Sequence, residues 1–153
     1  MDRAYVAVPA EGELEVGTIY RRRDIHRRFG GNRQAGIVPC KRDKIVFLFH
    51  TFEPSQQFYR DGIDEDGIYW YSGEGVTGDM GWTSANLALR DHEENGAQLW
   101  LFERAQRRGG LWRFKQKMRY LGHRYVKRID KGGQARRTIV FGLLPAKERH
   151  RLS

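Results

Sequence analysis

Carboxylates and aromatic side chains lie close together in one stretch of this sequence, residues 58–86. Asp61 and Asp64 lie between Tyr59 and the aromatic run 69–71. Aromatic faces stack on nucleic-acid bases, and a carboxylate accepts hydrogen bonds from the exocyclic amine of a base. These residue types suit a pocket for an extruded base. The same pattern also suits an acidic turn that caps its own backbone beside core aromatic residues, and composition does not separate the two.

Two strongly basic segments flank this acidic stretch. Residues 21–44 carry nine Lys and Arg against two acids, and residues 104–137 carry thirteen against one, whereas residues 53–94 carry ten acids against two bases. The net charge is +9 and the isoelectric point is about 10.0. Basic surfaces bind polyanions by releasing condensed counterions, so nucleic acid is the expected partner. A merely solvated basic surface is the alternative.

Other site chemistries find little support in the sequence. The chain has five histidines, none paired at a ligand spacing, and one cysteine, Cys40, so neither a zinc site nor an internal disulfide is expected. No Gly-Lys-Ser/Thr follows the glycines, which excludes a Walker loop. We expect no cofactor and no metal. A nuclease that holds magnesium through Asp61, Asp64 and Asp66 remains an alternative, although no lysine lies beside these acids.

Strand patterns dominate the rest of the chain. The apolar run Ile45–Phe49 predicts a strand that is buried on both faces. In residues 111–121 apolar and cationic residues alternate, which predicts one packed face and one row of cations. Residues 123–129 and 136–144 flank a glycine-rich turn and predict a hairpin. Shorter aromatic and apolar strands are expected at 68–71 and 99–102.

Two short helices are expected, over about 20–29 and about 85–94, with Ser84 as the N-cap of the second. Many strands and few helices predict a mainly β (α+β) fold, a barrel or sandwich. The length fits one domain, residues 1–147, with a flexible basic tail at 148–153. Because Trp70 alternates with Tyr71, it points to the opposite face of its strand, where core packing is its expected role.

The sequence has no membrane signal. No stretch approaches the roughly 20 apolar residues of a membrane span, and the first residues lack the apolar core of a signal peptide. We therefore expect a soluble, cytoplasmic protein that does not bind membranes and associates with the nucleoid through its charge. The oligomeric state does not follow from the sequence, and a monomer is the working expectation.

The order of short motifs resembles the SRA (SET and RING-associated) domains, which read modified cytosine in DNA and carry a YDG motif. The matching pieces in the central stretch are Tyr59-Arg60-Asp61-Gly62, the segment Gly67–Gly75, Gly78-Asp79-Met80 and Asn86-Leu87-Ala88-Leu89. Upstream, Ile25–Gly31 and Ala35-Gly36-Ile37 are similar to the glycine-rich opening segment of bacterial SRA-like modules. Downstream, residues 130–145 are similar to their closing hairpin. The likeness covers roughly residues 15–146.

The resemblance implies a PUA-like, SRA-like twisted β-barrel that flips 5-methylcytosine into a pocket without catalysis. By this likeness Tyr59 and Tyr71 stack on the two faces of the base. Asp61 accepts from its N4 amine, with Asp64 as the alternate. The pocket also includes Ser72 and Gly73.

The basic segments are then expected to hold the phosphates of a methylated duplex. The expected backbone contacts are Arg21, Arg22, Arg23, Arg27, Arg28 and Arg33 on one side, and Arg113, Lys115, Lys117 and Arg119 on the other. Arg33 or Gln34 would fill the space that the flipped base leaves. An RNA-binding module is a further alternative, because PUA-like barrels also bind RNA.

Overall fold

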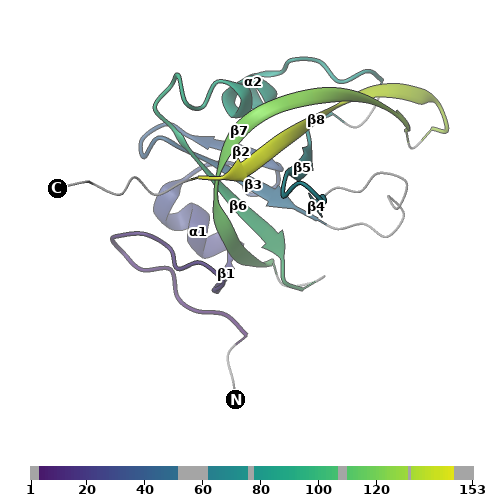
Figure 1. Ribbon diagram of the computed structural model, residues 1–153. Helices are drawn as coiled ribbons and strands as arrows, with labels where there is room; N and C mark the ends of the chain where they lie inside the picture. Colours follow the sequence, from purple (N-terminus) through teal and green to yellow (C-terminus); the bar gives the residue numbers. More distant parts are fainter. Residues whose placement is uncertain (1–3, 52–61, 76–77, 107–109, 131, 147–153) are drawn as a thin grey trace.

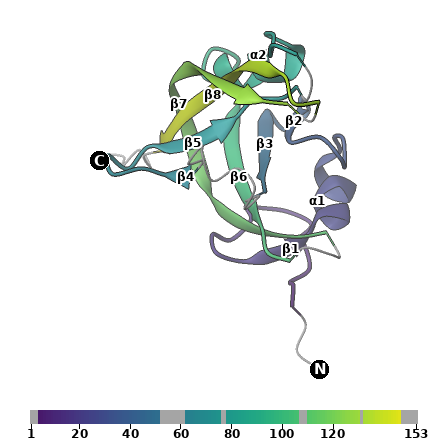
Figure 2. The same ribbon diagram turned by 90° about the vertical axis from the view of Figure 1, so that its right-hand side faces the viewer.

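One twisted β-sheet organises the molecule (Figures 1 and 2). In the computed structural model the described residues are 4–51, 62–75, 78–106, 110–130 and 132–146. Within them the strands are β1 (Ile19–Arg21), β2 (Ile37–Cys40), β3 (Ile45–His50), β4 (Gly62–Ile63), β5 (Tyr69–Ser72), β6 (Gln98–Arg104), β7 (Leu111–Ile129) and β8 (Ala135–Pro145). The mainly β fold predicted from the strand patterns is confirmed.

The strands follow the order β2-β3-β6-β7-β8-β5-β4, and β1 pairs separately with β7. All neighbouring strands are antiparallel except β3 and β6, which are parallel. Over the described residues the sheet is twisted and open, with β2 and β4 at the two ends of its path. The predicted hairpin is present: β7 and β8 pair from Ile129 and Ala135 at the turn back to Met118 and Pro145.

The long strand β7 bends the sheet. Its first residues pair with β1 and β6, and its later residues pair with β8. The register with β8 shifts between Tyr120 and Gly122, just beyond Met118, the last residue of β7 that pairs with β6. A bulge increases the local twist of a strand. Figure 2 shows the result, as β7 curves from β1 at the bottom of the molecule to α2 at the top.

Two helices pack against this sheet, α1 (Arg22–Phe29) and α2 (Ser84–Arg90). Helix α1 begins two residues later than predicted, because the preceding residues pair with β7 as β1. The predicted N-cap of α2 was wrong by one residue. The cap is Thr83, whose side chain accepts from the backbone N–H of Asn86 at 3.2 Å. Helix α2 also ends earlier than predicted, and residues 91–96 form turns.

Two hydrophobic clusters form the core. One lies under α1, and the other lies between α2, β5 and β8. Strand β3 contributes alternate residues to both clusters, so its predicted burial on both faces is confirmed. Trp70 lies on the opposite face of β5 from Tyr71, as predicted, but its predicted core role was wrong. Tyr69 and Tyr71 face the core, whereas Trp70 is half-buried beneath the guanidinium of Arg124, 4.0 Å from its ring centroid.

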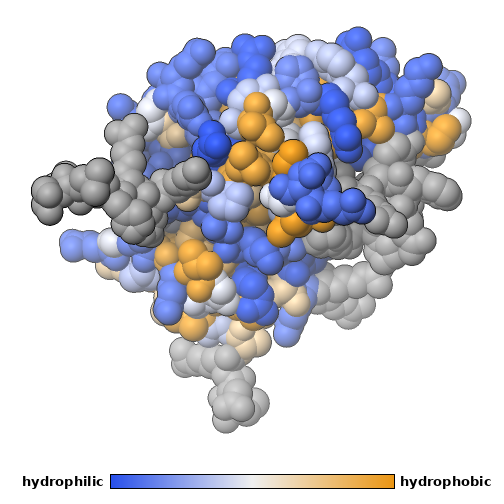
Figure 3. All heavy atoms as spheres, in the orientation of Figure 1, coloured by the Kyte–Doolittle hydropathy of each residue, from blue (hydrophilic) through white to orange (hydrophobic). Residues whose placement is uncertain are grey.

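The surface is largely polar. Figure 3 shows hydrophilic residues over most of one face, with a hydrophobic group near its centre over β7 and β8. Among the described residues, neither helix is long and apolar enough to span a membrane.

Candidate nucleic-acid interface

Tyr71 is fixed at the end of β5. Its side chain is 3% exposed, and its hydroxyl donates to the carbonyl oxygen of Gly36 at 3.0 Å and lies 3.2 Å from that of Phe49. The ring of His50 packs edge-on against it, with the ring centroids 5.5 Å apart. Tyr71 therefore joins β5 to the end of β3 and to the loop that leads into β2.

The other two principal residues of the predicted pocket, Tyr59 and Asp61, lie outside the described residues. Stacking of a base between two tyrosines thus stays a prediction. The described residues on both sides of them contact β5, since His50 packs against Tyr71 and Gly62 pairs with the strand.

Asp64 organises the turn between β4 and β5. One carboxylate oxygen accepts from the backbone N–H groups of Asp66 and Ile68, at 2.8 and 3.0 Å. The other accepts from the indole of Trp70 at 2.8 Å. The pKa of Asp64 is held below its usual value, first by the Trp70 hydrogen bond and further by the backbone N–H groups and the charge of Arg124. The carboxylate lies on the Trp70 side of β5, opposite the buried tyrosines.

Ser72 and Gly73 continue β5 into a tightly packed corner. The hydroxyl of Ser72 accepts from the guanidinium of Arg128. A Cβ on Gly73 would lie 2.9 Å from Oδ1 of Asn86 and 3.1 Å from the ring of Phe141, so only glycine fits. Asn86 is fully buried, and its amide bonds to the backbone on both sides of the following loop. This structural role of Asn86 did not follow from the sequence, although it lies within one of the matching motifs.

The loop between α1 and β2 exposes Arg33 and Gln34. Gly31 starts this loop at a φ of 88°, and a Cβ there would lie 2.5 Å from Val38. The side-chain oxygen of Asn32 accepts from two backbone N–H groups further along the loop, including that of Gln34 at 2.7 Å. The loop is therefore a compact turn with the two predicted gap-filling residues at its surface.

Arg22 is engaged inside the protein. Its guanidinium donates to the carbonyl oxygens of Asn32 and Ala35, at 3.1 and 2.5 Å, and to Nε2 of His26 at 3.0 Å. It also lies over the ring of Phe49, 3.8 Å from the centroid. Burial lowers the pKa of Arg22 to about 10. These contacts use donors that the sequence had assigned to DNA phosphates.

The other cations predicted near α1 differ in whether their side chains have partners among the described residues. Arg21 pairs with Asp24 at 3.0 Å, and Arg28 donates to two backbone carbonyls of the N-terminal segment. Three others have exposed side chains with no hydrogen bond or ion pair to a described residue: Arg23, Arg27 and Arg33. Arg23 and Arg27 lie one turn apart on α1, which gives this helix a cationic outer face.

The predicted row of cations on β7 has internal partners. Arg113 donates to the carbonyl oxygen of Gly17, Lys115 pairs with Glu103, and Lys117 pairs with Glu13. Arg119 is half-buried, and its Nε has no hydrogen-bond partner among the described residues. The alternation itself is confirmed over the first half of β7, where the apolar positions are buried.

The hairpin supplies three further arginines that sequence reasoning did not single out. Arg124 and Arg128 contact β5 through Trp70 and Ser72. Arg136 is buried, and it donates to the carbonyl oxygens of two glycines in the loop after β5, at 2.6 and 2.7 Å. For Arg124 and Arg128, membership of a basic segment was the only signal in the sequence, whereas Arg136 also lies in the segment that resembles the closing hairpin of SRA-like modules.

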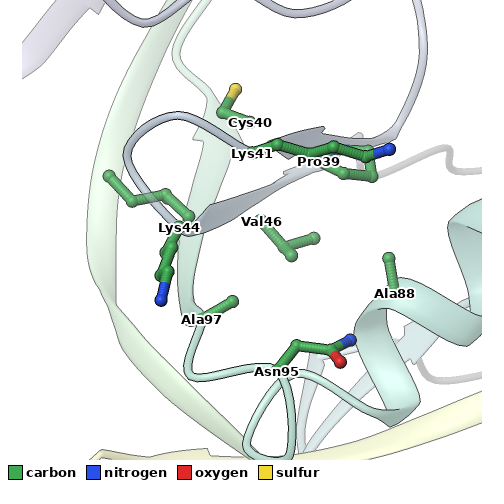
Figure 4. Close-up of a pocket in the computed structure, with 9 residues that line it drawn as sticks. Pro39, Cys40, Lys41, Lys44, Val46, Ala88, Asn95 and Ala97 are labelled. Carbon is green, nitrogen blue, oxygen red and sulfur yellow. The ribbon is translucent and has the colours of Figure 1, made fainter.

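A cavity of about 370 Å³ lies away from these residues, between the β2–β3 turn and α2 (Figure 4). Its lining is mostly apolar, with two lysines at the margin. None of the predicted pocket residues lines it. We assign it no role in the site.

Comparison with known proteins identifies the family. The family model for the ScoMcrA-like SRA domain matches residues 16–152. No curated protein matches the chain. Among solved structures, the chain is similar to one described as the sulfur binding domain and SRA domain of ScoMcrA complexed with phosphorothioated DNA, with 25% identity and a TM-score of 0.71. That match covers 91% of this chain and 42% of the other.

Two further structures share the fold at lower identity. The DNA recognition domain of the cytosine modification-dependent restriction endonuclease LpnPI is 16% identical with a TM-score of 0.68, and the match covers 90% of this chain and 76% of that one. The SRA domain of SUVH5, complexed with hemi-methylated CG DNA, is 17% identical with a TM-score of 0.61, and the match covers 93% and 95%. With its open twisted sheet and a family match over nearly its whole length, the chain belongs to the ScoMcrA-like SRA domain family.

Proposed function

We propose that this chain binds duplex DNA that carries 5-methylcytosine and extrudes the modified base into a pocket between Tyr59 and Tyr71. Asp61 accepts a hydrogen bond from the N4 amine, and Arg33 or Gln34 fills the gap in the duplex. Exposed arginines on α1 contact the phosphates. Membership of a family of DNA-binding reader modules supports the general part of this proposal.

The position of Tyr71 carries the specific part. Its hydroxyl lies on the backbone of the loop that exposes Arg33 and Gln34, and its ring contacts the residue that ends β3. The candidate stacking residue and the candidate gap-filling residues therefore belong to one connected structure. A reader that extrudes a base needs both elements within one duplex contact.

Three duplexes and one RNA test this function. Titration by fluorescence anisotropy compares a methylated duplex, the same unmodified duplex, a phosphorothioated duplex and a structured RNA. We expect the methylated duplex to bind most tightly at every salt concentration. Affinity for all four ligands should fall steeply as salt rises, because the phosphate contacts are independent of sequence, whereas the ratio between methylated and unmodified duplex should change much less.

Each alternative makes a different prediction in the same titration. Equal affinity for methylated and unmodified duplex would contradict the proposed function. Preference for the phosphorothioated duplex would mean that the protein recognises a modified backbone and not a modified base. Preference for RNA would support an RNA-binding module. Incubation of methylated plasmid with magnesium or manganese checks the absence of catalysis, and nicking would contradict it.

Arg27→Gln tests the phosphate contacts of α1. Because this side chain is exposed and has no described partner, we expect the change to remove one phosphate contact only. The slope of log affinity against log salt should then fall by about one unit, equally for methylated and unmodified duplex. An unchanged slope would place the helix away from the DNA.

A further inference from the structure

The loop that exposes Arg33 and Gln34 is held from the α1 side by Arg22. One guanidinium nitrogen donates to the carbonyl oxygens of Asn32 and Ala35, which lie on either side of the two exposed residues. A single planar group thus fixes the start and the end of the turn. Lysine has no rigid fork of donors and cannot reproduce this set of contacts.

His26 fixes the orientation of that guanidinium. Nδ1 of His26 lies 2.8 Å from the carbonyl oxygen of Gly30, which only accepts, so Nδ1 carries the proton. Nε2 is then the acceptor for Nε of Arg22, at 3.0 Å. Burial is the main factor that lowers the pKa of His26, and the neutral ring matches this arrangement. The ring of Phe49 supports the guanidinium from its face.

The same loop is held from the β5 side by Glu74. Its Oε1 accepts from the backbone N–H of Ile37 at 2.8 Å, directly after the residue whose carbonyl accepts from Tyr71. A Cβ on Gly36 would lie 3.2 Å from the Tyr71 hydroxyl and 3.9 Å from Glu74 Oε1. The end of the loop therefore lies against both side chains, and Glu74 is itself placed by Asn86, which bonds its backbone N–H and carbonyl.

We propose that Arg22 and Glu74 are positioning residues that hold the loop Asn32–Gly36 at a fixed distance from Tyr71, so that entry of the loop into the duplex and extrusion of the base occur together. This inference rests on the proposed function. A loop that is ordered before binding loses less conformational entropy when it inserts, and the gain appears in the extruded state rather than in general affinity. Neither residue needs to touch DNA in this role.

Base extrusion is measured with 2-aminopurine placed beside the methylated cytosine. We expect Arg22→Gln and Glu74→Ala to lower the equilibrium between extruded and stacked base by roughly tenfold, the effect of freeing about one backbone residue. Affinity for unmodified duplex and the salt slope should stay near those of the wild type. Glu74→Gln keeps an acceptor oxygen for Ile37 and should restore extrusion.

Arg27→Gln, from the same helix, is the matched comparison and should show the opposite pattern, with a lower salt slope and normal extrusion at saturating protein. If Arg22→Gln instead lowers the slope by about one unit and leaves extrusion intact, Arg22 is a phosphate contact and the inference is wrong. Arg22→Lys keeps the charge and replaces Arg22→Gln if that variant fails to fold. Because Arg22→Lys removes only the planar set of guanidinium donors, it should still reduce extrusion of the base.

Hydrogen exchange of the free protein separates this inference from the proposed function. In Arg22→Gln and Glu74→Ala we expect the amide protons of Gln34, Ala35 and Ile37 to exchange at least about tenfold faster, while those of β8 keep their rates. Unchanged exchange in the loop would overturn the positioning role. If the wild type gives no 2-aminopurine signal on methylated DNA but the loop amides respond as expected, the proposed function fails and the positioning of the loop stands.

Discussion

Tyr71→Ala should remove the preference for methylated DNA and lower the free energy of unfolding by about 3–5 kcal/mol. The ring is 3% exposed within the second core cluster, so its loss leaves a cavity beside β8. Loss of a stacking face removes roughly 1–3 kcal/mol of binding free energy for the extruded base. Denaturant unfolding measures the first effect. Anisotropy titration under conditions where the variant is folded measures the second.

Tyr71→Phe is the control for this change. It keeps the ring and removes the hydroxyl that bonds the carbonyl of Gly36, so we expect a stability loss of about 0.5–1.5 kcal/mol and a retained preference for the methylated duplex. If folded Tyr71→Ala discriminates as well as the wild type, the ring is a core residue only, and the pocket does not include it.

Asp61→Ala should lose roughly 1–3 kcal/mol of affinity for methylated duplex. A carboxylate in the pocket accepts from the N4 amine of cytosine, whereas thymine presents a carbonyl there. Affinity for unmodified duplex should stay the same or rise slightly, because a negative charge leaves the interface. Paired titrations of methylated and unmodified duplex measure the difference directly.

Asp64→Ala provides the comparison on the neighbouring turn. Its carboxylate bonds two backbone N–H groups and the indole of Trp70, so we expect a lower free energy of unfolding and an unchanged preference for the methylated duplex. The reverse outcome, with preference lost in Asp64→Ala and kept in Asp61→Ala, would make Asp64 the acceptor. If neither change affects the preference, the acidic segment is a turn and the base is read elsewhere.

Much of the fold follows from the sequence, because hydrophobic periodicity is a local property of the chain. The apolar run at 45–49 becomes β3, buried on both faces, and the alternation at 111–121 becomes the first half of β7. The glycine-rich turn closes the predicted hairpin. The ends of the strands were less predictable. The strand that begins at Leu111 continues to Ile129 through a bulge, because its second half pairs with β8.

The sequence identified the candidate site residues by their types, but it did not establish the role of each residue. The resemblance to SRA domains pointed to Tyr59, Asp61 and Tyr71, and the structure describes only Tyr71 among these. Which face of its strand each polar side chain occupies could be seen only in the folded structure. Asp64 proved to bond the side chain of Trp70, which only the register of β4 with β5 brings about.

The strand pattern and the positive charge of the two basic segments follow from the sequence. Whether each of those charged side chains has a partner within the protein depends on contacts that form only after folding. Lys117 pairs with Glu13, 104 residues away, and Arg22 bonds the loop after its own helix, while Arg27 on the same helix stays exposed. The periodicity of apolar residues is a property of neighbouring positions in the sequence, so it predicts strands directly. The interaction of two charges depends on their distance in space, which folding sets by bringing distant segments together.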